Sequence, residues 1–213
     1  VNTSTSAFAV IGTSLFAGTS NAGVFRSTND GATWTSSNVG IADRTIMALA
    51  VKGSSVFAGA YRGGGVFLST DSGVSWLQIN TGFPGLLSVL SFTVKGPNIF
   101  AGTYNNGIFL STNNGANWTA VSNGLPAYPV VNALVANDAY IFAGIGSGGS
   151  GGVYRSANDG TNWSGINSGL KDTAVFALAL SGTNLYAGSY AGVFFSTNNG
   201  TSWTATGLTN SSV

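Results

Sequence analysis

The sequence predicts an all-β fold made of five repeats, and three observations carry this prediction. Segments of eight residues that end in tryptophan, here named octets, recur every 40 to 45 residues and contain all five Trp residues of the 213-residue chain. Short apolar runs rich in Val, Ile and Phe alternate with turns rich in Gly, Asn and Ser. No segment of about eleven residues or more has helical periodicity. Four short strands in a repeat of this length are typical of one blade of a β-propeller, and a solenoid of the same strands is the alternative.

Each repeat contains four predicted strands in a fixed order. The first strand is an apolar run, at 7–12, 46–53, 90–96, 131–138 and 175–182. The second contains Ala-Gly near its end, at 15–19, 56–60, 99–103, 141–145 and 185–189. The third begins with Gly-Val or Gly-Ile, at 23–27, 65–69, 107–111, 152–156 and 192–196, and the fourth begins at the octet Trp. We therefore expect one propeller domain over 1–213, with blades at about 1–40, 41–82, 83–124, 125–168 and 169–213.

The octets align without gaps, as STNDGATW (27–34), STDSGVSW (69–76), STNNGANW (111–118), SANDGTNW (156–163) and STNNGTSW (196–203). Their shared positions are Ser27, Asn29, Gly31, Trp34, Ser69, Asp71, Gly73, Trp76, Ser111, Asn113, Gly115, Trp118, Ser156, Asn158, Gly160, Trp163, Ser196, Asn198, Gly200 and Trp203. Asn and Asp side chains accept hydrogen bonds from backbone N–H groups about two residues on, and glycine adopts positive φ at low cost. The octet therefore predicts a tight turn into the fourth strand, which the Trp anchors on the blade. We interpret the octet residues as structural and not as ligands.

The octets resemble the Asp-box, or BNR repeat, Ser-X-Asp-X-Gly-X-X-Trp. This repeat occurs in sialidases, sortilin-like receptors, xyloglucan-cleaving hydrolases and photosystem assembly factors. The resemblance covers all five repeats, although only Asp71 keeps Asp at the third position and the other octets carry Asn. It implies a propeller scaffold whose octet turns lie on the face opposite the usual ligand site, and it implies no particular activity.

The composition excludes most catalytic sites. The chain has no His or Cys, and all six of its acidic residues are Asp, so it can form neither a Ser-His-Asp triad nor a thiolate or imidazole metal site. We predict no cofactor and no metal. Charged residues make up 6% of the chain and the net charge is +1 without a basic cluster, which argues against nucleic acid as a partner. No apolar run approaches the length of a membrane span, and the abundance of small polar residues favours a secreted or bacterial cell-surface protein.

The enzyme alternative rests on Asp43 and Asp172. A sialidase-like site requires a Tyr/Glu pair, which a chain without Glu cannot supply. A glycoside hydrolase-like pair could still be built from Asp43 and Asp172, which no predicted turn uses. Both occupy the same position of the connection between two repeats, and each lies beside a cation, Arg44 or Lys171. A repeated position with a cation neighbour is typical of a solvated ion pair, so we predict a non-catalytic protein.

The variable parts of the repeat are the loops after the second strand and after the fourth. Propellers of known type present these two kinds of loop on one face, where ligands bind. Aromatic faces stack on sugar rings, and amide or guanidinium donors bind hydroxyl groups. We predict recognition of a carbohydrate or a protein partner, with candidate residues Tyr61, Arg62, Tyr104, Asn105, Asn106, Tyr190, Arg44 and Lys171. Packing between blades is the alternative reason for the three Tyr residues, and a structural module of a larger surface protein is the alternative function.

Five complete repeats favour a monomer that closes as a ring of five blades. A slice of a longer array, or a larger propeller completed by dimerisation, is the alternative. The segment GSGGSGG at 146–152 has the composition of a flexible linker, either natural or engineered.

Overall fold

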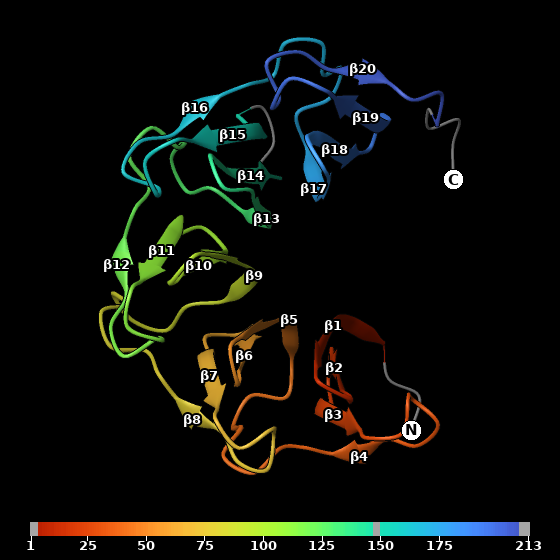
Figure 1. Cartoon of the computed structure of the whole chain (residues 1–213). Helices are drawn as coiled ribbons and strands as arrows, with labels where there is room; N and C mark the ends of the chain where they lie inside the picture. Colours follow the sequence, from red (N-terminus) through yellow and green to blue (C-terminus); the bar gives the residue numbers. More distant parts are fainter. Residues whose placement is uncertain (1–3, 147–149, 209–213) are drawn as a thin grey trace. The chain divides into compact units, whose positions relative to one another are not determined.

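The computed structural model describes residues 4–146 and 150–208, so part of the GSGGSGG segment lies outside the described residues. The strands form five four-stranded antiparallel sheets, and no helix occurs in the described residues. The predicted all-β fold with five propeller blades is thus confirmed (Figure 1).

Each blade consists of four strands that follow one another both in the sequence and across the sheet. Blade 1 contains β1 (Thr5–Ile11), β2 (Ser14–Thr19), β3 (Gly23–Ser27) and β4 (Thr35–Ser36). Blade 2 contains β5 (Ile46–Lys52), β6 (Ser55–Ala60), β7 (Gly65–Ser69) and β8 (Leu77–Gln78). Blade 3 contains β9 (Val89–Lys95), β10 (Asn98–Thr103), β11 (Ile108–Ser111) and β12 (Thr119–Ala120). Blade 4 contains β13 (Val131–Ala136), β14 (Ile141–Ile145), β15 (Gly152–Ser156) and β16 (Ser164–Gly165). Blade 5 contains β17 (Val175–Ser181), β18 (Asn184–Ser189), β19 (Gly192–Ser196) and β20 (Thr204–Ala205).

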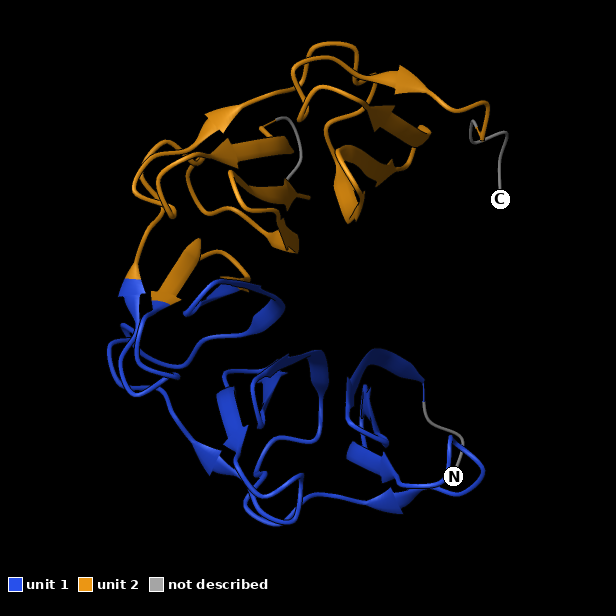
Figure 2. Ribbon diagram, in the orientation of Figure 1, with its two compact units in different colours: residues 1–101, 111–119 blue, residues 102–110, 120–213 orange. Residues whose placement is uncertain are grey.

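The chain divides into two compact units. Unit 1 is Val1–Ala101 with Ser111–Thr119, and unit 2 is Gly102–Leu110 with Ala120–Val213 (Figure 2). The contacts described below each lie within one of these units.

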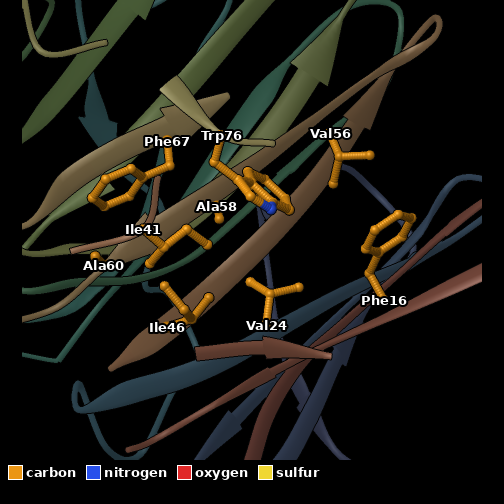
Figure 3. Close-up of a cluster of buried hydrophobic side chains, with 9 residues drawn as sticks. All are labelled: Phe16, Val24, Ile41, Ile46, Val56, Ala58, Ala60, Phe67 and Trp76. Carbon is orange, nitrogen blue, oxygen red and sulfur yellow. The ribbon is translucent and has the colours of Figure 1, made fainter. Parts of the chain in front are cut away.

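The hydrophobic core lies between neighbouring blades. In unit 1, a cluster of nine buried side chains combines Phe16, Val24 and Ile41 with residues of blade 2 that include Ile46 and Trp76 (Figure 3). In unit 2, a second cluster joins blade 4 to blade 5 in the same way. Because each sheet buries its faces against other sheets, the stability of a blade depends on the blades beside it.

The octet forms the predicted tight turn with positive φ at its glycine, but its hydrogen bonds span a different number of residues from those predicted. In the octet at 69–76, the Gly73 N–H donates to the hydroxyl of Ser69 at 2.7 Å, and the Ser75 N–H donates to the Asp71 carboxylate at 3.0 Å. Both acceptors lie four residues before their donors, and not two as predicted. The reason is that two successive residues adopt positive φ, 57° at Ser72 and 83° at Gly73, which brings the seventh residue back to the third. The other four octets contain the same two hydrogen bonds.

The octet at 69–76 is expected to give the fold an acid-sensitive contribution. The hydroxyl of Ser75 is the largest cause that holds the pKa of Asp71 at about 2, below its ordinary value of 3.8, and the N–H of Ser75 and the hydroxyl of Ser69 add to it. A folded-state pKa below the unfolded one means that the carboxylate stabilises the fold above about pH 4, and that this stabilisation is lost as the pH falls through about 2. Asp71→Asn is expected to remove this part of the acid dependence.

Urea unfolding of both proteins at about pH 7, 4 and 2 measures the effect, and the difference between their free energies of unfolding should change only below about pH 4. The matched converse is Asn198→Asp, since the Asn198 octet also has a serine, Ser202, at its seventh position. That variant should gain acid dependence. A difference between wild type and Asp71→Asn that stays constant from pH 7 to 2 would contradict the expectation.

The octet Trp residues anchor each blade on the preceding one, whereas the sequence predicted anchoring of the turn on its own blade. The Trp76 indole N–H donates to the Ser37 hydroxyl of blade 1 at 3.3 Å, and the Trp118 indole donates to the Ile79 carbonyl of blade 2 at 2.8 Å. Trp163 and Trp203 donate to carbonyls of blades 3 and 4 in the same way. These four Trp side chains are 3–5% exposed, because each ring lies between two sheets. Trp34 of blade 1 is 37% exposed.

A glycine completes each of these junctions. The Trp76 N–H donates to the Val39 carbonyl, and a Cβ on the adjacent Gly40 would lie 2.0 Å from the Trp76 carbonyl oxygen. A Cβ on Gly82, Gly124 or Gly169 would likewise lie 2.0, 2.2 or 2.3 Å from the carbonyl oxygen of Trp118, Trp163 or Trp203. Only a residue without a side chain fits, so the segment that follows the fourth strand of one blade passes directly against the octet of the next.

Candidate functional site

The loops after the second and fourth strands lie side by side, as a shared ligand face requires. In unit 1, the connection at 41–45 runs between two loops, because the Gly23 N–H donates to the Arg44 carbonyl and the Tyr61 N–H donates to the Thr45 carbonyl, each at 2.8 Å. In unit 2, the Asn105 N–H donates to the Pro129 carbonyl at 3.0 Å. These two connections are therefore each held to a loop of a blade that they join.

These three loops of unit 1 form an open pocket of about 450 Å³. Blade 1 contributes Ser20 and Asn21, the connection contributes 42–45, and blade 2 contributes 62–64. The lining therefore combines hydroxyl, amide, guanidinium and carboxylate groups. Such a set can donate hydrogen bonds to a polar ligand and accept them from it.

Two guanidinium groups give the pocket its charge. Arg44 and Arg62 both line it and both are exposed. Within the described residues, neither guanidinium makes a hydrogen bond or an ion pair, whereas the carboxylate of the neighbouring Asp43 accepts the Thr45 N–H at 2.9 Å. The pocket therefore contains two cationic groups whose donors are available to an anion.

The backbone of Arg62 is strained. Its φ is 49°, in the left-handed region that disfavours side chains other than Gly, Asn and Asp. At the matching loop position of blade 3, Asn105 adopts a φ of 67°. Strain of this kind concentrates at functional sites, where the side chain has a role that outweighs the cost in stability.

The predicted site residues are divided between the two units. Unit 1 holds Arg44, Tyr61 and Arg62, and of these only the two arginines line the pocket. Unit 2 holds Tyr104, Asn105, Asn106, Tyr190 and Lys171, all of them exposed. Tyr61 is half-buried, and the ring of Tyr190 packs edge-on against Phe176 with centroids 4.5 Å apart. The Tyr190 contact lies within blade 5 and therefore does not test packing between blades, whereas the two arginines form a polar site without any aromatic lining.

The two aspartates of the enzyme alternative accept hydrogen bonds from backbone N–H groups of the loops around them. Asp43 accepts the N–H two residues on, and Asp172 does the same with the Ala174 N–H at 3.0 Å and also accepts the Ala191 N–H at 3.3 Å. In the described part of the chain, neither forms an ion pair with its cationic neighbour. The predicted ion pairs are therefore absent there, and one oxygen of Asp43 and both oxygens of Asp172 accept backbone N–H groups instead.

Sequence reasoning missed several loop residues. Ser20 and Asn21 line the pocket, but their loop contains no aromatic or charged residue that would single it out. Leu86 is 82% exposed and Tyr128 is 78% exposed, on connections between blades. Tyr128 also has a φ of 51°, and its flanking sequence, LPAYPV, does not predict this left-handed backbone.

Solved structures with the same fold have diverse activities. A crystal structure of an ancestral GH74 enzyme is 22% identical with a TM-score of 0.77, and the match covers 94% of this chain and 30% of that one. The extracellular domain of a one-component system from B. thetaiotaomicron is 15% identical with a TM-score of 0.74, covering 90% and 27%. YCF48 bound to a D1 peptide is 12% identical with a TM-score of 0.71, covering 99% and 69%. These identities show the β-propeller fold alone, and the chain spans less than a third of the first two proteins.

No family model matches the sequence, and no curated protein matches it. Among the described residues, no helix is long and apolar enough to cross a membrane. In the same residues, no three His, Cys, Asp or Glu side chains gather in a group that could hold a metal ion.

Proposed function

We propose that this chain is a non-catalytic binding module, secreted or exposed on a cell surface, whose pocket at Arg44 and Arg62 binds a carbohydrate that carries carboxylate groups. The octets are interpreted as Asp-boxes that build the scaffold. The observation that carries the proposal is the pair of unpartnered guanidinium groups in one polar pocket. The peptide bound to YCF48 and the extracellular location of the B. thetaiotaomicron domain support a binding role outside the cell.

The chemistry of the lining matches an acidic sugar. A guanidinium group donates two parallel hydrogen bonds to a carboxylate, which gives both charge and orientation. Ser20, Asn21 and Thr45 can bond the sugar hydroxyls, and the second oxygen of Asp43 can accept from one of them. An open pocket suits a segment of a chain-like ligand better than a small molecule, which would be buried on most sides.

The carbohydrate-active alternative, with Asp43 and Asp172 as the carboxylate pair, is less favoured. Hydrolysis requires one carboxyl group that is protonated and directed at the leaving oxygen, whereas both of these carboxylates accept backbone N–H groups. The GH74 similarity, at 22% identity, supports the shared fold alone. The third candidate, a purely structural module, does not explain why Arg62 adopts a left-handed backbone.

Isothermal titration with oligogalacturonate is expected to detect binding, and neutral oligosaccharides of equal length should bind at least about tenfold more weakly. Arg44→Gln is expected to weaken oligogalacturonate binding by roughly tenfold, and so is Arg62→Asn. Arg62→Asn should also raise the free energy of unfolding by up to about 1 kcal/mol, because Asn tolerates the left-handed backbone. The variant would thus be more stable and bind less, which separates loss of a ligand contact from loss of the fold.

Two controls test the assignment. Lys52→Gln removes a positive charge of unit 1 that donates to Asn114 and does not line the pocket, and it should leave binding unchanged. Arg44→Lys with Arg62→Lys keeps the charge but loses the two-pronged geometry, and binding should still fall. Binding of an acidic peptide instead of the uronate would overturn the carbohydrate assignment, and equal binding by wild type and both arginine variants would overturn the site.

A further inference from the structure

Asp43 of the pocket and Asp172 of blade 5 occupy the same local structure. Each lies three residues before the first strand of its blade, β5 or β17. Each accepts the backbone N–H two residues on, that of Thr45 at 2.9 Å and that of Ala174 at 3.0 Å. Both side chains are half-buried. The two carboxylates are thus held by the same kind of turn, and they differ in the second oxygen.

The second carboxylate oxygen has a protein donor in blade 5 and none in blade 2. In blade 5, this oxygen of Asp172 accepts the Ala191 N–H at 3.3 Å, from the loop between β18 and β19. In blade 2, the second oxygen of Asp43, Oδ2, has no hydrogen-bond or ion-pair partner among the residues that the structure describes. An ionised carboxylate offers acceptors on both oxygens, so one acceptor of Asp43 remains for a ligand.

The length of the loop after the second strand explains this difference. The loop of blade 5 consists of residues 190–191, whereas that of blade 2 is longer and consists of residues 61–64. In the longer loop, the Gly64 N–H donates to the Tyr61 carbonyl at 3.0 Å and closes a turn within the loop. A backbone donor that could face Asp43, as the Ala191 N–H faces Asp172, is therefore used inside the loop of blade 2.

Gly64 also fixes the position of the unpaired oxygen. The side-chain amides of Gln78 and Asn80 donate to the Gly64 carbonyl at 2.9 and 3.3 Å, which holds the loop in place. A Cβ on Gly64 would lie 2.8 Å from the Cβ of Asp43 and 2.9 Å from its Oδ2. Because the glycine has no side chain, the loop passes directly against the carboxylate without donating to it. The unpaired acceptor is therefore a fixed part of the pocket wall.

The charged groups of the pocket require two different features in a ligand. Arg44 and Arg62 carry donors only, so they bind an anionic group. Asp43 carries acceptors only, so it binds a hydroxyl group and repels a ligand oxygen that has no hydrogen. A ligand that satisfies all three side chains has a carboxylate and a free hydroxyl group close together, as a uronate ring does.

We propose that Asp43 determines which acidic sugars the pocket accepts, selecting uronates with free ring hydroxyls over uronates whose hydroxyls are acetylated. The inference rests on the proposed function and narrows its substrate class. An acetylated hydroxyl has no hydrogen, so its oxygens would face Oδ2 of Asp43 and leave that acceptor unpaired. A site built to bond a hydroxyl group rejects the analogue that lacks it, because the polar group of the site then has no partner.

Isothermal titration with two matched ligands tests the proposal. The probes are an oligogalacturonate and the same oligogalacturonate with its hydroxyls acetylated, so the two carry equal charge. Wild type is expected to bind the acetylated probe at least about tenfold more weakly. Asp43→Asn keeps an oxygen for the Thr45 N–H and replaces the other by an amide donor, which can bond the ester carbonyl. The ratio of the two dissociation constants should therefore fall below about threefold.

The ratio separates hydrogen bonding from charge. Asp43→Asn also removes a negative charge beside two arginines, which strengthens the binding of both probes alike. The matched control is Asp30→Asn, which removes one negative charge from the octet of blade 1. Asp30 has a φ of 54°, and Asn114 at the same position of the blade 3 octet has a φ of 55°, so asparagine fits this backbone. Asp30 does not line the pocket, and the control should keep the wild-type ratio.

Three results would contradict the proposal, and they differ in what else they contradict. If wild type binds neither probe, the proposed function fails together with this inference. If wild type binds oligogalacturonate but does not discriminate between the probes, or if Asp43→Asn keeps the wild-type ratio, the inference alone fails. Urea unfolding supplies a readout that needs no ligand, since Asp43→Asn should keep the wild-type midpoint. A lower midpoint would mean that Oδ2 already has a donor in the protein.

Discussion

Trp76→Ala is expected to lower the free energy of unfolding by about 3–5 kcal/mol, the cost typical of deleting a buried tryptophan. The side chain is 5% exposed, contacts Phe16 and donates its indole N–H to Ser37, so the substitution opens a cavity between blades 1 and 2 and removes a hydrogen bond. Urea denaturation followed by circular dichroism measures the loss.

The chain supplies a matched control for this prediction. Trp34→Ala removes the same residue at the same octet position, but its side chain is 37% exposed, and its ring contact within unit 1 is to Phe8 of its own blade. We expect a loss below about 1 kcal/mol, measured by the same urea denaturation. Equal losses for the two variants would show that the Trp stabilises its own turn, as the sequence first suggested, and not the junction.

Gly40→Ala is expected to have the second largest effect, about 2–5 kcal/mol. The residue has a φ of 90°, which costs an alanine about 1–3 kcal/mol, and the added methyl group would lie 2.0 Å from the Trp76 carbonyl oxygen, so the backbone has to move. Thermal and urea unfolding both report the change.

Gly207→Ala separates the two causes. Gly207 has a nearly identical φ of 89°, but no atom lies within 4 Å of a Cβ placed there. We therefore expect only the strain contribution, about 1–3 kcal/mol. If Gly40→Ala cost no more than Gly207→Ala, the close passage of one blade against the next octet would contribute nothing to stability.

The strands could be predicted from the sequence because the repeat supplies five aligned copies of each signal. The first strand of blade 2 was expected at 46–53 and is found at Ile46–Lys52. The first strands of the other four blades begin and end within two residues of their expected ranges. The partner of each octet Trp could not be predicted. The same Trp would bury equally well on its own blade or on the preceding one, and the pattern of residues within one repeat contains no information about the contact between repeats.

The site was predicted only in part, for a similar reason. Arg44 and Arg62 were selected as cations on variable loops, and they do line one pocket. Tyr61 was selected for its aromatic ring, but it does not line the pocket. Its backbone N–H donates a hydrogen bond to the Thr45 carbonyl, which holds the backbone beside the connection, and its side chain is half-buried. The left-handed backbone of Arg62 has no sequence signature, since the residue type is one that ordinarily avoids it.

The junction of Trp, glycine and carbonyl also bears on how such a chain can change in length during evolution. Because blades 1 and 2 meet through the same residue types as blades 4 and 5, a duplicated repeat inserted between two blades would find a matching surface on both of its sides. Loss of a whole repeat would leave two compatible surfaces facing each other. A gene that encodes this chain can therefore gain or lose blades by recombination in steps of one repeat, whereas a deletion of half a repeat would join two surfaces that do not fit.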